Sequence, residues 1–224
     1  MTRGPILFVG VLAASVVAPP SVLRVKASAA VAPCVSAAAA EYQRSPGRRV
    51  VVETAAIGSQ DSAEGADVVV AADEELNRVI ESGASDPDLD VDGVATIPWV
   101  LAGAPGTAAP ELRSLARPGS LVRTLGGTVA RETWRRLHLQ GFSPARVERV
   151  RETPVRLQAG EAAVVPLSLA GAGPVTILDV PPLRVHALAV RASPRKDASR
   201  AFLDFLAAGP GNAAFRACGR TEAR

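Results

Sequence analysis

The chain has 224 residues, of which 48% are hydrophobic and 4% aromatic, so it can bury a sizeable core filled mainly by small apolar side chains. Its 25 Lys and Arg residues exceed its 22 Asp and Glu residues by only three, and no basic run alternates with aromatic residues. This composition excludes a disordered chain and gives no support to a nucleic-acid partner.

The first twenty residues have the composition of a secretory signal peptide. Arg3 supplies a basic start, residues 5–17 form an apolar segment, and Val16-Val17-Ala18 offers small residues for cleavage. An apolar segment of about 13 residues is shorter than the roughly 20 that a membrane-spanning helix needs. We therefore expect residues 1–20 to be removed and the mature protein to be periplasmic or extracellular, with a retained N-terminal anchor as the alternative.

Predicted strands and helices alternate along the N-terminal half. We predict strands over 23–27, 49–53 and 66–72, helices over 35–42 and 74–81, and a polar loop over 58–65. This alternation indicates a parallel sheet covered by helices, which is an α/β fold. The segment 86–92 is polar and acidic, so we expect it to form a surface turn. A calcium-binding loop is the alternative, but the segment lacks the Gly and Glu that complete such a loop.

The C-terminal region predicts a strand followed by a helix. Apolar runs over 175–180 and 185–190 are followed by Ser193-Pro194 and an amphipathic segment over 198–207. Ser before Pro is a frequent helix start, so we expect a helix capped by Ser193 and begun by Pro194.

Two cysteines, Cys34 and Cys218, remain after the predicted cleavage. An oxidising compartment would allow them to form a disulfide, and two separately buried thiols are the alternative.

Several phrases recur in an order that resembles the molybdate-binding proteins of ABC importers. They are ADVVVAADEELNRVIESG, LAGAPG, LARPG and LQAGEAAVV, and the chain closes with AFLDFLAAGPGNAAFRACG in the manner of periplasmic solute-binding proteins. The resemblance runs with gaps from about residue 23 to about residue 219. It implies two lobes, each a mixed sheet flanked by helices, with a ligand between them. Lobe I would be 21–96 plus 188–224 and lobe II 97–187, with 97–103 and 183–190 crossing between them.

The resemblance also implies where a ligand would be held. In that family serine hydroxyls and backbone N–H groups at helix N-termini bind the oxyanion, a chemistry that helix dipoles favour. The family's two ligand serines fall on Ala30 and Ser59, two backbone N–H donors on Ala130 and Val150, and a ligand tyrosine on Pro166.

Ala30 and Pro166 cannot donate a side-chain hydrogen bond, so we expect molybdate to bind weakly if at all. Ser28 could replace the lost hydroxyl if the chain stays extended between residues 28 and 30.

Other polar residues are weaker candidates. We expect His138 to lie on the surface, and His186 to be structural unless it reaches the cleft, where its charged form would attract an anion. Arg131 would favour a carboxylate or phosphate if it pointed into the cleft. No motif for a nucleophile, a metal or a phosphate loop occurs, so we expect no enzyme activity, no metal and no cofactor.

The sequence thus predicts an exported, monomeric solute-binding protein that binds a small oxyanion such as molybdate or tungstate and delivers it to the membrane permease of an ABC importer. The alternative is a paralogue that keeps the fold, has lost oxyanion binding and acts as an interaction or accessory protein.

Overall fold

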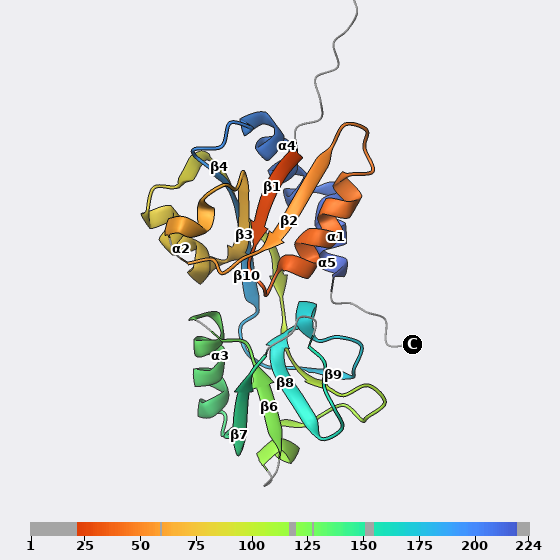
Figure 1. Ribbon diagram of the computed structural model, residues 1–224. Coiled ribbons are helices and arrows are strands. Elements are labelled where there is room, and N and C mark those ends of the chain that lie inside the picture. Colours follow the sequence, from red (N-terminus) through yellow and green to blue (C-terminus); the bar gives the residue numbers. More distant parts are fainter. Residues whose placement is uncertain (1–21, 59, 117–119, 127, 151–154, 219–224) are drawn as a thin grey trace, which may run out of the picture.

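The computed structural model describes residues 22–58, 60–116, 120–126, 128–150 and 155–218. The chain forms two lobes, each built on its own sheet and stacked one above the other (Figure 1). The predicted α/β fold with two lobes is therefore confirmed. The predicted signal peptide and Ser59 lie outside the described residues.

The first sheet has the strand order β2-β1-β3-β10-β4. Its strands are β1 (Val22–Ala27), β2 (Arg49–Thr54), β3 (Val68–Ala72), β4 (Ser85–Ile97) and β10 (Leu183–Val190). β1 pairs in parallel with β2 and β3, whereas β10 is antiparallel to β3 and β4. The mixed sheet thus joins N-terminal strands to one that follows more than 80 residues later, because β10 returns from the second lobe.

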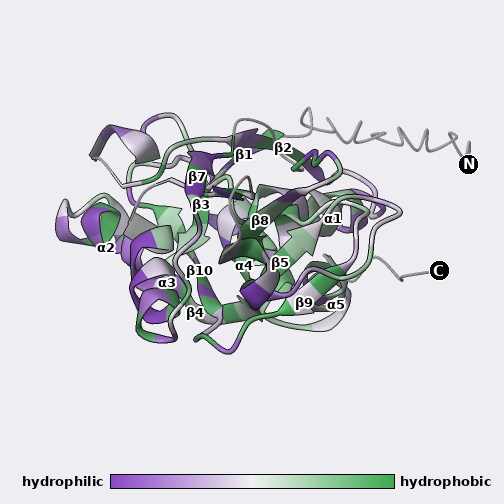
Figure 2. Ribbon diagram, turned by 90° about the horizontal axis from the view of Figure 1, so that it is seen from below, coloured by the Kyte–Doolittle hydropathy of each residue, from purple (hydrophilic) through white to green (hydrophobic). Residues whose placement is uncertain are grey.

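Helices cover both faces of this sheet, as the alternation of side chains in β3 requires. Val68 and Val70 pack with α1 (Ala32–Tyr42), α4 (Lys196–Ala207) and α5 (Gly209–Ala217), whereas Val69 packs with α2 (Asp73–Glu81). All five residues of β3 are buried, which is typical of a strand with a helical layer on each side. A short 3-10 helix, η1 (Gln60–Ala63), lies on the α2 side. Figure 2 shows hydrophobic residues concentrated in the strands and hydrophilic residues on α2 and α3.

The second sheet has the order β7-β6-β8-β5-β9. Its strands are β5 (Trp99–Gly103), β6 (Leu121–Thr124), β7 (Arg146–Arg149), β8 (Glu161–Pro166) and β9 (Val175–Ile177), with α3 (Thr128–Leu139) beside it and the short helices η2 (Leu112–Ala116) and η3 (Leu167–Leu169). β6 is parallel to β7 and β8, and β5 is antiparallel to β8 and β9. Only Pro98 separates β4 from β5, so the chain enters the second lobe directly from the first sheet.

The predicted acidic surface turn over 86–92 is wrong, because these residues lie in β4 and pair with β10. Leu89 is buried and the flanking Asp88 and Asp90 are exposed, which is the period of two expected for a strand with one covered face. The frequent Asp residues looked like a loop composition and obscured that alternation.

The predicted Ser cap of the C-terminal helix is also wrong. α4 begins at Lys196, and its N-cap Arg195 makes no side-chain capping bond. The Ser193 hydroxyl instead accepts the Arg195 N–H at 3.0 Å and donates to Asp67 Oδ1 at 2.6 Å. Ser193 therefore joins the segment after β10 to the start of β3 rather than capping the helix.

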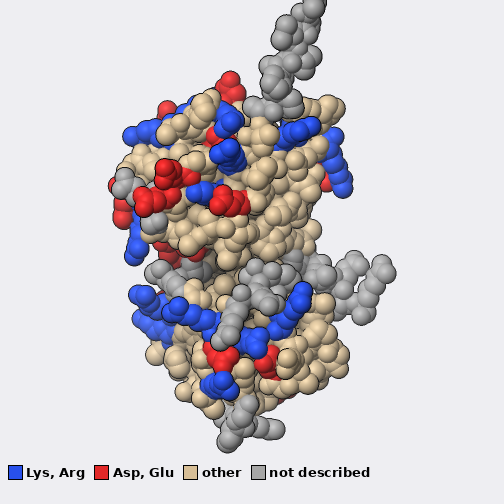
Figure 3. Space-filling view, in the orientation of Figure 1, with Lys and Arg blue, Asp and Glu red and all other residues tan. Residues whose placement is uncertain are grey.

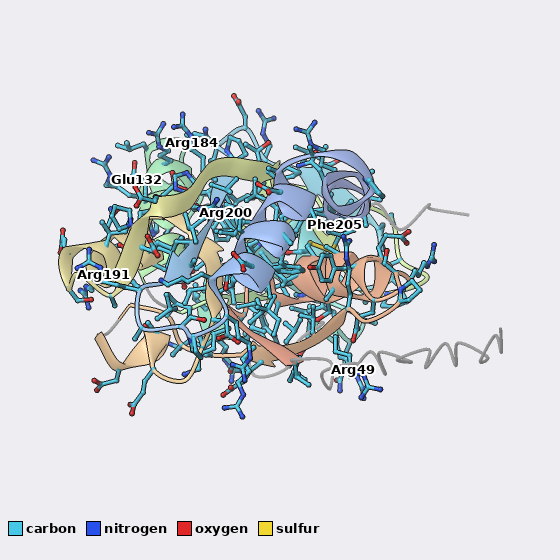
Figure 4. All side chains as sticks on the ribbon, turned by 90° about the horizontal axis from the view of Figure 1, so that it is seen from above. Arg49, Glu132, Arg184, Arg191, Arg200 and Phe205 are labelled. Carbon is cyan, nitrogen blue, oxygen red and sulfur yellow. A yellow bond between two sulfur atoms is a disulfide. The ribbon has the colours of Figure 1, made fainter. Side chains whose placement is uncertain are left out.

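Cys34 and Cys218 form a disulfide with a Cα–Cα distance of 5.1 Å, so the predicted bridge is confirmed. It links α1 to the end of α5, where both helices pack on the first sheet. Figure 4 shows the disulfide and Phe205 of α4 in this helical layer, and the Phe205 ring lies 5.1 Å from that of Tyr42 in α1.

Candidate functional site

The carboxyl ends of the parallel strands in the two sheets face each other across the space between the lobes (Figure 1). In the first lobe Ala27 of β1 pairs with Thr54 of β2, and both strands end there. In the second lobe Thr124 of β6 pairs with Arg149 of β7 at the ends of those strands. Ligands of α/β proteins bind at such carboxyl ends, since the loops that follow are free of the sheet.

A cavity of about 420 Å³ lies between these ends. Residues of both lobes line it, namely Ala29, Thr54, Ala55, Ala56, Ile57, Gly58, Glu74, Glu75, Arg78 and Gly126. The small residues come from the turns after β1, β2 and β6, where short side chains leave backbone N–H groups accessible. The cavity has the size and the position of a small-molecule site.

Two carboxylates at the start of α2 give the cavity an acidic wall. Glu74 is exposed and makes no hydrogen bond or ion pair with any residue that the structure describes. Glu75 accepts the Ala72 N–H at 3.2 Å. Burial raises the pKa of Glu75, and the nearby Ser28 hydroxyl and the Ala72 N–H offset part of that rise. Sequence reasoning missed both residues, although their place directly after a buried strand could have indicated them.

Basic groups lie at the same cavity. Arg78 of α2 donates to the Gly58 carbonyl oxygen at 3.1 Å. From the second lobe, Arg149 packs its side chain against Gly126, since a Cβ built on Gly126 would lie 3.2 Å from Arg149 Cδ and Nε. Arg149 is exposed and makes no ion pair with another described residue, so its guanidinium is available to a ligand.

Ser28 is almost fully buried, with 1% of its surface exposed. Its N–H donates to the Val70 carbonyl oxygen, and its Oγ makes no hydrogen bond of ordinary geometry with the described residues. The hydroxyl lies beside the Glu75 carboxylate, and the next residue, Ala29, lines the cavity. A role for Ser28 in ligand binding stays a prediction.

Ala30 contacts the second lobe through its backbone. Its carbonyl oxygen accepts a hydrogen bond of 2.6 Å from the Ser168 hydroxyl of η3, and the bond is buried. Ala30 itself is 4% exposed, so η3 covers the N-terminal end of α1. Pro166, at the end of β8 just before η3, pairs with Trp99.

The other predicted ligand positions lie in the second lobe. Ala130 is buried in the first turn of α3, the part of a helix whose N–H groups lack partners within the helix. The Val150 N–H donates to the Thr124 carbonyl oxygen at 2.7 Å, so a ligand would have to share or displace this bond. Ligand contacts by Ala130 and Val150, like one by Ser59, stay predictions.

A second crevice of about 430 Å³ lies beside the crossing strands. It is lined by residues that include Asp73, Glu74, Glu132 and Arg184, and Figure 4 shows Glu132 and Arg184 on the same side of the molecule. Hydrogen bonds from Arg135 and Arg136 lower the pKa of the Glu132 carboxyl to about 2.

Both histidines lie outside the candidate cavity. His186 Nε2 of β10 lies 3.1 Å from Asp73 Oδ1, which ties the crossing strand to α2. His138 is exposed on α3, as expected from the sequence.

Replacing Ser168 by Ala is expected to loosen the contact between the lobes. The change leaves the buried Ala30 carbonyl oxygen without its side-chain donor, which costs about 1–3 kcal/mol unless the lobes separate and water replaces it. We expect a larger radius of gyration by small-angle scattering without ligand. Ser82→Ala is the matched control, because the Ser82 hydroxyl donates at 2.8 Å to a carbonyl within α2. An unchanged radius in Ser168→Ala would contradict the expectation.

Within the described ranges, no group of three or more His, Cys, Asp or Glu residues is arranged to hold a metal ion. Of the helices described, none combines the length and the apolar character that a bilayer crossing needs.

Comparison with known sequences and structures places this geometry among binding proteins. The model of a family described as bacterial extracellular solute-binding protein matches residues 23–221. No curated protein matches the chain. The fold is similar to that of the periplasmic molybdate-binding protein of Azotobacter vinelandii, with 16% identity, a TM-score of 0.64 and coverage of 88% of this chain and 97% of that one.

Two further solved structures have the same architecture. The sulfate-binding protein SubI of Mycobacterium tuberculosis has 19% identity and a TM-score of 0.61, over 89% of this chain and 86% of that one. A putative phosphate ABC transporter substrate-binding protein of Clostridium perfringens, solved with bound phosphate, has 13% identity and a TM-score of 0.61, over 87% of this chain and 96% of that one. At these identities the likeness establishes the fold.

Proposed function

Because the chain belongs to the bacterial extracellular solute-binding proteins, we propose that it captures a small solute with an anionic group between its two lobes and delivers it to the permease of an ABC importer. The observation that carries this proposal is the cavity of about 420 Å³, which lies at the carboxyl ends of both sets of parallel strands and is lined from both lobes. Residues 1–20 would direct export, and lobe I (21–96 plus 188–224) and lobe II (97–187) would close on the solute as hinged binding proteins do.

The anionic group has a natural place on the wall of the second lobe. Gly126 lies two residues before the start of α3, and the first turn of a helix attracts negative charge. Arg149 lies against Gly126 and can offer two parallel N–H bonds to a carboxylate, phosphate or similar oxyanion. Similar structures named for molybdate, sulfate and phosphate agree with an anionic ligand, and a molybdate-like oxyanion is the finer form of the proposal.

Binding is tested by thermal-shift screening and titration calorimetry against molybdate, tungstate, sulfate, phosphate and small carboxylates. We expect at least one of them to raise the unfolding temperature, because a ligand of the folded state stabilises it. Replacing Arg149 by Ala should weaken that ligand about tenfold or more, since a hydrogen bond to a charged group contributes about 1.5–3 kcal/mol. Arg113→Ala, an exposed change in the same lobe, is the control. Equal affinities in the two variants would contradict the role of Arg149.

A second candidate function is favoured by the contact between Ser168 and Ala30. It covers the N-terminal end of α1, where the resembling family holds its ligand, and Ala30 has no hydroxyl to offer there. A chain that keeps the fold but no longer binds an oxyanion would act as an interaction or accessory protein. The same screen separates the two functions, since this one requires that no small solute bind.

A further inference from the structure

The two walls of the cavity between the lobes differ in charge. On the wall of the first lobe, the carboxylates of Glu74 and Glu75, from the first turn of α2, outnumber the single guanidinium of Arg78. On the wall of the second lobe lies Gly126, against which the Arg149 side chain packs. Figure 3 shows basic side chains, all of them Arg in this lobe, gathered along the edge of the second lobe that faces the first. A solute with only an anionic group would bind at the wall of the second lobe and be repelled by the two carboxylates on the wall of the first.

We propose that the solute is a small zwitterion, whose ammonium group contacts Glu74 and Glu75 while its anionic group contacts Arg149 and the start of α3. This inference rests on the proposed function, since it assigns the chemical class of the solute that the same cavity takes. The volume of about 420 Å³ fits a small organic solute that reaches both walls.

Glu74 supports a cationic group on the solute more strongly than Glu75 does. It lines the cavity, yet no described residue neutralises it by a hydrogen bond or ion pair. Acidic residues in the first turn of a helix do stabilise the helix dipole, and Asp73 already supplies such a charge at the first position of α2. Two further carboxylates at a cavity wall add a repulsion between themselves that a bound ammonium group would relieve.

The carboxylates match an ammonium group better than a metal ion. Metal sites in proteins gather several ligands, and within the part of the chain that the structure describes no group of three His, Cys, Asp or Glu residues is arranged to hold a metal ion. An ammonium group needs only acceptors for its three N–H donors. The two carboxylates of Glu74 and Glu75 supply acceptors on one side of the cavity.

The test compares pairs of solutes that differ only in the amino group. The probes are glycine with acetate, β-alanine with propionate, and 2-aminoethylphosphonate with ethylphosphonate, each titrated calorimetrically into the wild-type protein. We expect at least one aminated member to bind ten times more tightly than its partner. The double variant Glu74→Gln, Glu75→Gln should abolish this preference, and phosphate and sulfate should bind to it as tightly as to the wild type or more tightly.

The variants are designed to keep the fold. Gln at position 75 retains an acceptor for the Ala72 N–H, and Glu74→Gln alone changes an exposed side chain without a described partner. Glu81→Gln, an exposed change at the other end of α2, is the matched control and should leave every affinity unchanged.

Each outcome separates this inference from the proposed function. If amine-free anions bind the wild type as tightly as their aminated partners, and the double variant leaves that ratio unchanged, the zwitterion is refuted and anion capture stands. If neither the probes nor the oxyanions bind to the wild type or to any variant, the proposed function fails and this inference fails with it.

Discussion

Removing the disulfide between Cys34 and Cys218 is expected to lower the free energy of unfolding by roughly 2–5 kcal/mol. The two cysteines are 184 residues apart, so the bridge restricts nearly the whole unfolded chain and should act near the upper end of this range. It also fixes the C-terminal helix α5 to α1, which packs on the edge of the first sheet formed by β1 and β2.

The double variant Cys34→Ala, Cys218→Ala is the appropriate test, because it leaves no single thiol to pair with another molecule. Urea unfolding of the oxidised wild type, the reduced wild type and the double variant gives the three free energies. The reduced protein and the double variant should agree with each other and fall below the oxidised protein. A double variant within 1 kcal/mol of the oxidised protein would show that α1 and α5 are held by packing alone.

Periodicity and family-like phrases were sufficient to predict most of the fold. The buried run over 66–72 contains β3, and the alternation of strands and helices around it predicted the helix-covered sheet. The order of phrases then predicted two lobes, which neither composition nor local pattern could show. β4 was missed because its strand pattern is carried by acidic residues, which local composition assigns to turns.

The candidate cavity lies near positions that the sequence indicated, although its chemistry differs from the expected one. Ala30, Ser59 and Ala130 were expected to contact a ligand, and Ala29, Ala56 and Gly126, from the turns after β1, β2 and β6, line the cavity. Ligand contacts by the three expected residues stay predictions. Small residues at the ends of parallel strands carry that information locally. The acidic wall depends on where α2 stands relative to the second lobe, and the sequence of α2 alone does not specify that.

The hydrogen bond from Ser168 to Ala30 is another contact between the lobes that local sequence could not predict. The two residues are 138 positions apart and belong to different lobes. Their meeting depends on how the crossing strands orient one lobe on the other. No sequence pattern near either residue encodes that orientation. The sequence therefore shows that Ala30 has no hydroxyl, but it does not show which group covers Ala30.

Replacing Asp67 by Ala is expected to destabilise the protein by roughly 2–4 kcal/mol, although Asp67 lies at the edge of the first sheet opposite the candidate site. The side chain is 2% exposed and joins three segments. Its Oδ2 accepts the Arg24 N–H at 2.8 Å, and its Oδ1 accepts the Ser193 hydroxyl at 2.6 Å and Arg195 Nη1 at 3.2 Å. Removing the carboxylate leaves these donors without their acceptor beside a cavity of about 680 Å³.

Three variants distinguish loss of charge from loss of hydrogen bonds at Asp67. Asp67→Asn keeps one oxygen acceptor and should cost less than Asp67→Ala. Ser193→Ala removes one donor to Asp67 and the acceptor of the Arg195 N–H, and should cost about 1–2 kcal/mol. Asp204→Ala, an exposed change on α4, should stay within about 0.5 kcal/mol of the wild type. Because Arg195 is 33% exposed, water can hydrate its guanidinium once the carboxylate is gone, which keeps the expected cost below that of a fully buried ion pair. An Asp67→Ala protein whose free energy of unfolding in urea lies within 1 kcal/mol of the wild type would contradict this expectation. Water in the cavity would then replace the carboxylate, and backbone pairing and the apolar core would hold β1, β3 and the segment before α4 together.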